Sequence, residues 1–264
     1  MDSLLDNFDP ESMAARYQSA LPVPHICLDN FLVPEFAKEV ESGFPSLVEA
    51  RELGRTFKAV NEKGKTQITD PEKFTPSVRQ LHDFLASDEF VASLETLTGI
   101  PNLLADPEML GGGIHETGPR GRLDVHVDFN YIEDRQLHRR LNILIYFNDA
   151  WEESWGGDFE LWDDTVKNCM ASFSPIFNRM CMFDTNEISY HGVTAVKCPE
   201  GRSRKSFAAY YYTREAPEGW DGTSHTTIFK SRPNEKFKGG VLMPFQSAMR
   251  KGKRLVKKVI RPGK

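Results

Sequence analysis

The stretch that decides the fold is Arg122-Leu123-Asp124-Val125-His126-Val127-Asp128-Phe129, in which polar and apolar residues alternate. Alternation with a period of two is typical of a β-strand whose two faces differ. On such a strand, His126 and Asp128 lie on the same face. The stretch therefore predicts a strand that presents an imidazole and a carboxylate side by side.

Similar short segments surround this strand between Met109 and Thr213, and glycine, proline and aspartate separate them. The predicted strands are residues 109–116, 122–129, 139–147, 157–162, 178–184, 189–196 and 203–213. Many short strands at this spacing are typical of a sandwich, a jelly roll or a barrel. We therefore expect a mainly β protein with flanking helices.

The first hundred residues show a different pattern. Good helix formers after Pro10 predict a helix over 10–17, and apolar residues at helical spacing predict helices over 34–44, 76–87 and 88–98. Residues 25–32 predict a strand and a turn. Polar loop predominates after 216. The cationic group Arg135, His138, Arg139 and Arg140 fits a solvated connection best, with contact to an acidic substrate as the alternative. At about 150 residues per domain, 264 residues fit one domain. Its expected parts are N-terminal helices and supporting strands (1–108), a catalytic core (109–215) and an extension with a basic tail (216–264).

Charge is distributed unevenly along the chain. The net charge is −5, yet residues 250–264 hold eight basic and no acidic residues. The rest of the chain is net acidic and so lacks the overall positive charge of a nucleic-acid-binding protein. We therefore expect no nucleic-acid partner. The basic tail has three open interpretations: a weak contact with an anionic membrane surface, binding of a phosphorylated or nucleic-acid partner, or a docked or frayed tail.

The cysteines and the apolar segments of the chain indicate its cellular compartment. The four cysteines, Cys27, Cys169, Cys181 and Cys198, form no CxxC pair. This spacing excludes a zinc ribbon, disfavours a disulfide framework and predicts buried apolar thiols. No apolar run approaches the roughly 18 residues of a membrane span, and the acidic start lacks a signal-peptide pattern. We therefore expect a cytoplasmic protein.

A third imidazole and a possible anion receptor follow later in the chain. His191 comes 63 residues after Asp128 in another strand-like segment. Two histidines and one carboxylate are the ligand set of non-haem Fe(II) oxygenases, although a polar strand edge would also explain His126 and Asp128 alone. Arg204 and Ser206 share a strand face, where a guanidinium and a hydroxyl can bind a carboxylate. The alternative is a surface cation.

The order HxD, distal His and R-x-S resembles the Fe(II)/2-oxoglutarate-dependent dioxygenases, in particular their prolyl-4-hydroxylase-like branch. The segments 144–151 (LIYFNDAW) and 155–161 (WGGDFEL) are similar to the strand, loop and Gly-Gly turn of that branch. The resemblance covers about Gly111 to Thr213, roughly two fifths of the chain. It implies a double-stranded β-helix core of the jelly-roll or cupin-like type.

The resemblance implies a role for each matching residue. His126, Asp128 and His191 would ligate iron, and Arg204 would pair with the distal carboxylate of 2-oxoglutarate, with Ser206 beside it. Arg202 remains a second candidate for this anchor, because it lies on the same strand face as Arg204.

Three further residues are expected to line the pocket. The resemblance implies that Tyr146 donates its hydroxyl to the same carboxylate, and Asn142 shares its strand face. His115 stands near the place where the branch often has a tyrosine, so it is either a cosubstrate or substrate contact or an ordinary polar strand residue.

The implied activity is that of a hydroxylase using Fe(II), 2-oxoglutarate and O₂, with ascorbate as an optional reductant. It would hydroxylate a C–H bond of an acceptor and release succinate and CO₂. The acceptor stays open among a protein side chain, an amino acid, a glycan and a lipid-linked group. Two other functions remain: a cupin-like metal enzyme that does not use 2-oxoglutarate, and a non-catalytic jelly-roll module that binds carbohydrate or peptide.

Overall fold

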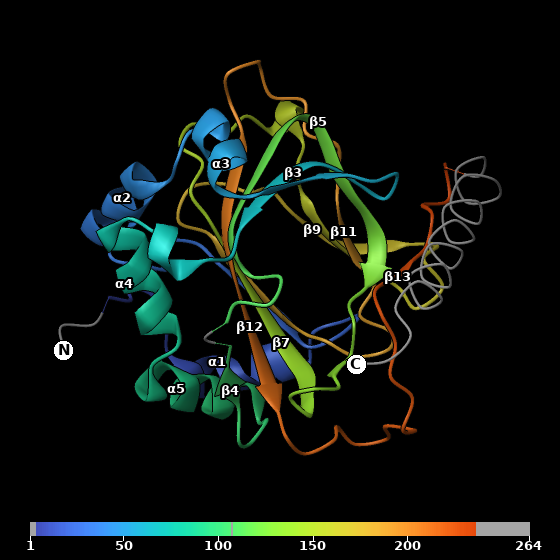
Figure 1. Cartoon of the computed structure of the whole chain (residues 1–264). Helices are drawn as coiled ribbons and strands as arrows, with labels where there is room; N and C mark the ends of the chain where they lie inside the picture. The colour runs from blue at the N-terminus through green and yellow to red at the C-terminus, as the bar shows by residue number, and fades with distance from the viewer. Residues whose placement is uncertain (1–3, 107, 236–264) are drawn as a thin grey trace, which may run out of the picture.

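The computed structural model describes residues 4–106 and 108–235, which are coloured in Figure 1. The basic tail at 250–264 therefore lies outside the described residues. The described strands are β1 (His25–Leu28), β2 (Arg55–Lys58), β3 (Glu62–Ile68), β4 (Leu104–Ala105), β5 (Gly113–Val127), β6 (Tyr131–Ile132), β7 (Leu137–Tyr146), β8 (Phe159–Trp162), β9 (Cys169–Phe173), β10 (Met180–Asp184), β11 (His191–Val193), β12 (Arg204–Thr213) and β13 (Ile228–Phe229). The α-helices are α1 (Pro10–Gln18), α2 (Pro34–Gly43), α3 (Leu47–Leu53), α4 (Pro76–Leu85) and α5 (Asp88–Thr98).

The strands form an antiparallel sheet that curls into a nearly closed jelly roll (Figure 1). Its main path runs in the order β1-β10-β7-β12-β5-β11-β8-β9. Strand β5 belongs to both halves of the roll, because its first part pairs with β12 and β3 and its last part pairs with β11. The prediction of a mainly β jelly-roll core with flanking helices is confirmed.

Strand β5 corrects one predicted boundary. The sequence predicted separate strands over 109–116 and 122–129, whereas β5 is continuous from Gly113 to Val127. Its glycine-rich middle bends instead of turning back, with Arg120 at a φ of 65°. A Cβ at Gly121 would lie 2.3 Å from a side-chain atom of Thr117, so only glycine fits the bend. The glycine and proline residues that indicated a turn instead mark a kink within one strand.

Four predicted helices are present at the expected places and pack on one face of the sheet (Figure 1). Proline stands at the start of α1, α2 and α4, and the Ser87 hydroxyl accepts a hydrogen bond from the Phe90 amide at the start of α5. Gly99 ends α5 with a φ of 74°. The main core lies between helices and sheet and includes Tyr17, Phe36, Leu81, Leu94, Ile143 and Phe207.

Helix α3 and the hairpin of β2 and β3 were not predicted. Helix α3 spans only seven residues, although Ser46 and Glu49 form a complete capping box at its start. The hairpin strands, RTFK and EKGKTQI, carry few apolar residues. They form because β3 pairs with β5, where Gln67 lies opposite His115. This pairing places the hairpin over the interior of the roll.

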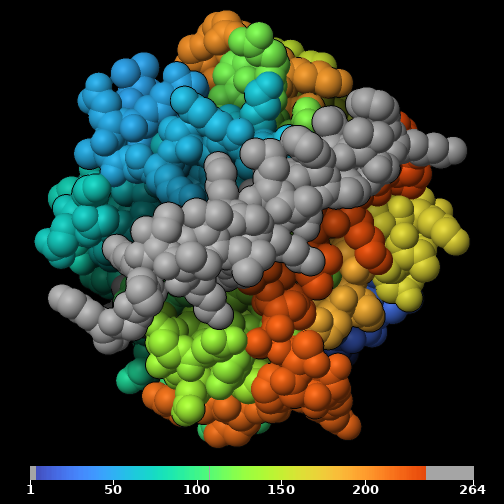
Figure 2. Space-filling view, turned by 45° about the vertical axis from the view of Figure 1, so that its right-hand side comes forward, coloured from blue at the N-terminus to red at the C-terminus, as the bar shows by residue number. Residues whose placement is uncertain are grey.

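Residues 217–235, the described part of the segment after 216, are polar loop, as predicted, except that they contribute strand β13 to the sheet. Phe229 in β13 lies opposite His126, and Lys230 donates its amide to the carbonyl of Val125. Figure 2 shows this segment in orange to red beside the yellow part of the surface. Among the described residues, each helix is too short or too polar to cross a lipid bilayer.

Candidate metal centre

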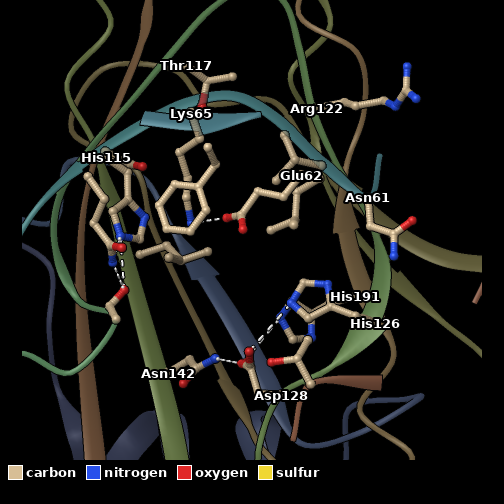
Figure 3. Close-up of a pocket in the computed structure, with 18 of the residues that line it drawn as sticks. Asn61, Glu62, Lys65, His115, Thr117, Arg122, His126, Asp128, Asn142 and His191 are labelled. Carbon is tan, nitrogen blue, oxygen red and sulfur yellow. Dashed lines mark hydrogen bonds and ion pairs between the residues drawn. The ribbon is translucent and has the colours of Figure 1, made fainter. Parts of the chain in front are cut away.

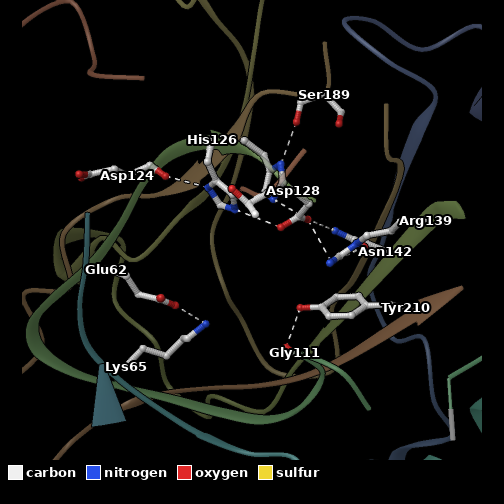
Figure 4. Close-up of polar contacts among 12 residues, drawn as sticks. Glu62, Lys65, Gly111, Asp124, His126, Asp128, Arg139, Asn142, Ser189 and Tyr210 are labelled. Atoms are coloured by element: carbon white, nitrogen blue, oxygen red, sulfur yellow. Dashed lines mark hydrogen bonds and ion pairs between the residues drawn. The ribbon is translucent and has the colours of Figure 1, made fainter. Parts of the chain in front are cut away.

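Three side chains meet at the end of β5. His126 of β5 lies directly opposite His191 of β11, and their ring centroids are 4.2 Å apart. Asp128 follows β5, with Oδ1 3.5 Å from Nε2 of His126 and Oδ2 3.5 Å from Nε2 of His191. One ligand atom from each residue lies within 4.8 Å of the other two (Figures 3 and 4).

Backbone carbonyls orient both imidazoles. Nδ1 of His126 lies 2.9 Å from the carbonyl oxygen of Asp124 (Figure 4). Nδ1 of His191 lies 2.8 Å from the carbonyl oxygen of Ser189. Each Nδ1 therefore carries the proton and donates it, which leaves the Nε2 lone pair aimed at the common centre. Burial, together with the neighbouring His126, lowers the pKa of His191 to about 3, so its imidazole is neutral at pH 7. Neutral imidazoles are the form that binds a metal ion.

Two polar side chains fix the third ligand. Oδ2 of Asp128 accepts a hydrogen bond from Nδ2 of Asn142 at 2.9 Å and pairs with Nη2 of Arg139 at 3.0 Å. Burial alone would raise the pKa of Asp128, but the charged Arg139 guanidinium opposes it, and that pKa lies well below the usual range. The carboxylate is therefore ionised over the whole physiological range. Asn142, which was predicted to line the pocket, lines the cavity and contacts the candidate ligand Asp128 directly.

Arg139 was predicted to lie in a solvated connection, and this was wrong for this residue. Its guanidinium is buried, lies 3.7 Å from the ring centre of Tyr210 and donates to Oδ1 of Asn142 through Nε and Nη2. The pairing of β7 with β12 is irregular at this point: Leu141 lies opposite Tyr211, but Arg139 lies opposite Tyr212. Strand β7 therefore has one extra residue between the two pairs. Because of this extra residue, Arg139 lies on the same inward face of β7 as Asn142. In a regular strand, two residues three positions apart would lie on opposite faces.

A cavity of about 610 Å³ extends from these ligands into the roll. It is lined by His126, Asp128 and His191 at one end and by Arg204, Ser206 and His115 deeper inside. Figure 3 shows His115 well separated from His126 and His191 across this space. A volume of this size is typical of a pocket for a small ligand.

Arg204 presents an unpaired donor inside this cavity. Its Nε donates to the carbonyl oxygen of Gly157 at 2.6 Å and its Nη1 to Oγ of Ser206 at 3.3 Å. Its Nη2 is buried and has no hydrogen-bond partner among the described residues. A buried guanidinium nitrogen without a partner is costly, and an anionic group in the cavity would satisfy it. Arg202, by contrast, is exposed and lies 5.2 Å above the ring of Trp155.

The two remaining predicted residues lie around this anchor in different ways. Tyr146 is fully buried beneath Arg204, whose Cζ lies 4.9 Å from the centre of the tyrosine ring, and its hydroxyl has no geometric hydrogen bond in the described part of the chain. His115 lines the cavity, with Nε2 3.0 Å from the carbonyl oxygen of Gly111 and 3.0 Å from Nε2 of Gln67. Burial, followed by the charge of Lys65, lowers the pKa of His115 well below its usual value, so this imidazole is neutral.

The mouth of the cavity comes from segments that the sequence did not single out. In the hairpin, Nζ of Lys65 lies 2.5 Å from Oε1 of Glu62, and this ion pair points into the cavity (Figures 3 and 4). From the other side, the Phe229 ring lies 5.3 Å from that of His126. Both segments reach the site through pairing with β5, and neither carries a local sequence motif that would have predicted this position.

Comparisons with known proteins identify a family model, a curated relative and solved structures that are similar to this chain. Residues 112–212 match the family model of the 2OG-Fe(II) oxygenase superfamily. A curated relative, the prolyl 3-hydroxylase OGFOD1 of Mus musculus, is 27% identical over 84 residues, which cover 30% of this chain and 15% of that protein. The match thus spans only a small part of the relative's length.

Solved structures show the same fold at low identity. A prolyl hydroxylase from Trichoplax adhaerens, in complex with a peptide fragment of the hypoxia inducible factor oxygen degradation domain, has a TM-score of 0.56 at 16% identity. The alignment covers 76% of this chain and 88% of that one. A Pseudomonas putida prolyl-4-hydroxylase has a TM-score of 0.54 at 15% identity and covers 76% of this chain and 98% of that one.

Proposed function

We propose that this chain, whose residues 112–212 belong to the 2OG-Fe(II) oxygenase superfamily, is a dioxygenase that hydroxylates a C–H bond of an acceptor and releases succinate and CO₂. One observation carries the proposal. A single cavity holds the triad of His126, Asp128 and His191 and, deeper inside, the unpaired Nη2 of Arg204.

The donor set fits Fe(II). Two imidazole nitrogens and one carboxylate would hold the ion and leave other coordination positions free, as in non-haem Fe(II) oxygenases. When bound, Fe(II) supplies the activation of O₂, with 2-oxoglutarate as the source of electrons and ascorbate as an optional reductant. In this proposal Arg139 and Asn142 keep the Asp128 carboxylate ionised and in place for the metal.

The inner end of the cavity fits the distal carboxylate of 2-oxoglutarate. Arg204 would neutralise this group through its free Nη2, and the Ser206 hydroxyl beside it would add a second donor. Tyr146 lies beneath the guanidinium with its hydroxyl unused. This receptor favours the proposal over a metal enzyme without 2-oxoglutarate, which would leave the buried guanidinium without a ligand.

For the acceptor, we propose a side chain carried by a peptide. The cavity opens beside β2 toward a second hollow, and Arg55, Phe57 and Phe129 line both. An extended chain could therefore lie across the mouth while one side chain enters. The mouse relative, named a prolyl 3-hydroxylase, makes proline-containing peptides the first acceptors to test.

We also propose that the whole chain works as one catalytic unit. The cavity is lined both by residues of the 1–108 part, such as Lys65, and by residues of the 109–215 part, such as Arg204. Phe229, from the segment after residue 216, completes the lining beside His126.

The test measures succinate formed from 2-oxoglutarate by the full-length chain with Fe(II) in air. We expect slow release without an acceptor and faster release when a suitable peptide is added. Asp128→Ala should abolish both rates, because it removes a ligand of the metal. Succinate release that persists in Asp128→Ala would contradict the proposed centre.

A further inference from the structure

We propose that Cys27 and Cys181 form an oxidative modification site, at which a hydroperoxide converts the two thiols into a reversible disulfide. Cys27 of β1 and Cys181 of β10 are direct partners across an antiparallel strand pair. Their sulfur atoms are 3.5 Å apart. The proposal does not depend on the catalytic function.

The backbone already has the spacing that a disulfide needs. Directly opposed residues of antiparallel strands have Cα atoms about 4.5 or 5.5 Å apart, and disulfides occur at about 4.4–6.8 Å. The sulfur atoms would only have to approach from 3.5 Å to about 2.05 Å. The bond can therefore form through side-chain rotation while the pairing of β1 with β10 stays intact.

The two thiols differ in a way that gives each a role. Cys27 is half-buried and reachable from solvent, whereas Cys181 is 1% exposed and donates a hydrogen bond to Cys27. This hydrogen bond lowers the pKa of Cys27, outweighing partial burial, and Arg179 lowers it further. Burial raises the pKa of Cys181 well above its usual value. Cys27 is thus the nucleophile and Cys181 the protonated partner.

The chemistry balances with hydrogen peroxide as the oxidant. The Cys27 thiolate attacks one peroxide oxygen, the O–O bond breaks, and a sulfenic acid forms while the other oxygen leaves as hydroxide and takes up the thiol proton. The Cys181 sulfur then attacks the Cys27 sulfur, the S–O bond breaks, and the Cys181 proton leaves with the hydroxide as water. Two thiols are oxidised and one peroxide is reduced to two waters.

The other two cysteines provide internal controls. Cys169 is exposed, and its thiol donates to the carbonyl oxygen of Ala171. Cys198 is buried and donates to the carbonyl oxygen of Arg202. Burial raises the pKa of both thiols, so each is less reactive than Cys27 despite the exposure of Cys169.

The position of the pair gives the modification a structural context. Cys181 belongs to the same buried cluster as Tyr146, Phe159 and Phe183. The Phe183 ring in turn lies 4.7 Å from the ring of His191. A disulfide would therefore fasten the outer strand β1 to the strand that backs the cavity wall.

Peptide mapping of the full-length protein tests the proposal. Trypsin would place the four cysteines on separate peptides, 17–38, 168–179, 180–197 and 198–202. The protein is treated with hydrogen peroxide in the presence of a chelator, alkylated under denaturing conditions, digested and examined by mass spectrometry. We expect peptides 17–38 and 180–197 to become linked, with the loss of two hydrogen atoms, and dithiothreitol to separate them.

Variants sharpen this test. Cys169→Ser should leave the linked peptides unchanged, whereas Cys181→Ser should leave Cys27 as a sulfenic acid that dimedone traps. Oxidation of Cys169 before Cys27 in the wild-type protein would overturn the proposal. Conversion of Cys27 to a sulfinic acid without any linked product would also overturn it, because it would show that Cys181 does not resolve the first intermediate.

Discussion

Arg139 and Asp128 form a buried ion pair in which Nη2 of the arginine lies 3.0 Å from Oδ2 of the aspartate. The same guanidinium holds Asn142, which donates to the same carboxylate oxygen. The carboxylate is thus fixed from behind by two groups that do not themselves face the proposed metal. Mutation of a partner of this kind typically weakens metal affinity about 10- to 100-fold.

The first prediction concerns Arg139→Lys, which keeps the charge but loses the planar fork that reaches Asp128 and Asn142 together. We expect about 10-fold weaker Fe(II) binding, measured by anaerobic calorimetry. The neighbouring Arg140→Lys is the matched control, because Arg140 donates to the Thr213 hydroxyl and not to Asp128. Equal Fe(II) affinity of the two variants would show that Arg139 does not position the ligand.

The second prediction separates the two arginines that the sequence could not rank. Arg204→Ala should raise the KM for 2-oxoglutarate about 10- to 100-fold, since a charge-assisted hydrogen bond contributes about 1.5–3 kcal/mol. Arg202→Ala should leave that KM nearly unchanged, because Arg202 is exposed and donates to the carbonyl of Asp149. Steady-state succinate release at varied 2-oxoglutarate gives both values, and the reverse ranking would place the anchor at Arg202.

The third prediction concerns stability and pH at Asp184, whose Oδ1 accepts a hydrogen bond from the Tyr17 hydroxyl at 2.5 Å. Burial raises the pKa of Asp184 to about 6, against the opposing effects of Tyr17 and Arg140. The folded state therefore keeps a proton that the unfolded state loses above about pH 4. This contribution to stability is complete below pH 4 and is lost as the pH rises through 6.

Asp184→Asn should remove this dependence, so the variant should gain about 2 kcal/mol relative to wild type between pH 4 and pH 7. Urea unfolding at several pH values measures the difference. Asp29→Asn is a control of opposite sign, because the Arg179 hydrogen bonds lower the pKa of Asp29 and favour its charged form. A constant difference between Asp184→Asn and wild type across this pH range would contradict the assignment.

The sequence predicted those helices and strands whose own residues show a helical or alternating pattern of apolar side chains. The helices α2 and α4 begin at Pro34 and Pro76 and bury apolar residues at helical spacing, so their positions followed from the sequence. The alternation around His126 likewise predicted which side chains share a face. The structure brings these residues together with His191 because β11 pairs with β5.

Features that depend on long-range pairing could not be predicted in this way. Arg139 faces the site only because of an irregularity in the pairing of β7 with β12, and no local signal marks it. Phe229 lies in a two-residue strand that forms by pairing with the end of β5. Cys27 and Cys181 are 154 residues apart in sequence and meet only through the register of β1 with β10.

The central claim is that one cavity binds Fe(II) through His126, Asp128 and His191 and binds 2-oxoglutarate at the same metal. The most direct measurement is an anaerobic titration of the metal-free protein with Fe(II) and 2-oxoglutarate, followed by visible absorption. We predict a metal-to-ligand charge-transfer band that requires both components and disappears in His191→Ala. Bound Fe(II) and bound 2-oxoglutarate without this band would show that the cosubstrate does not chelate the metal, and would contradict the account.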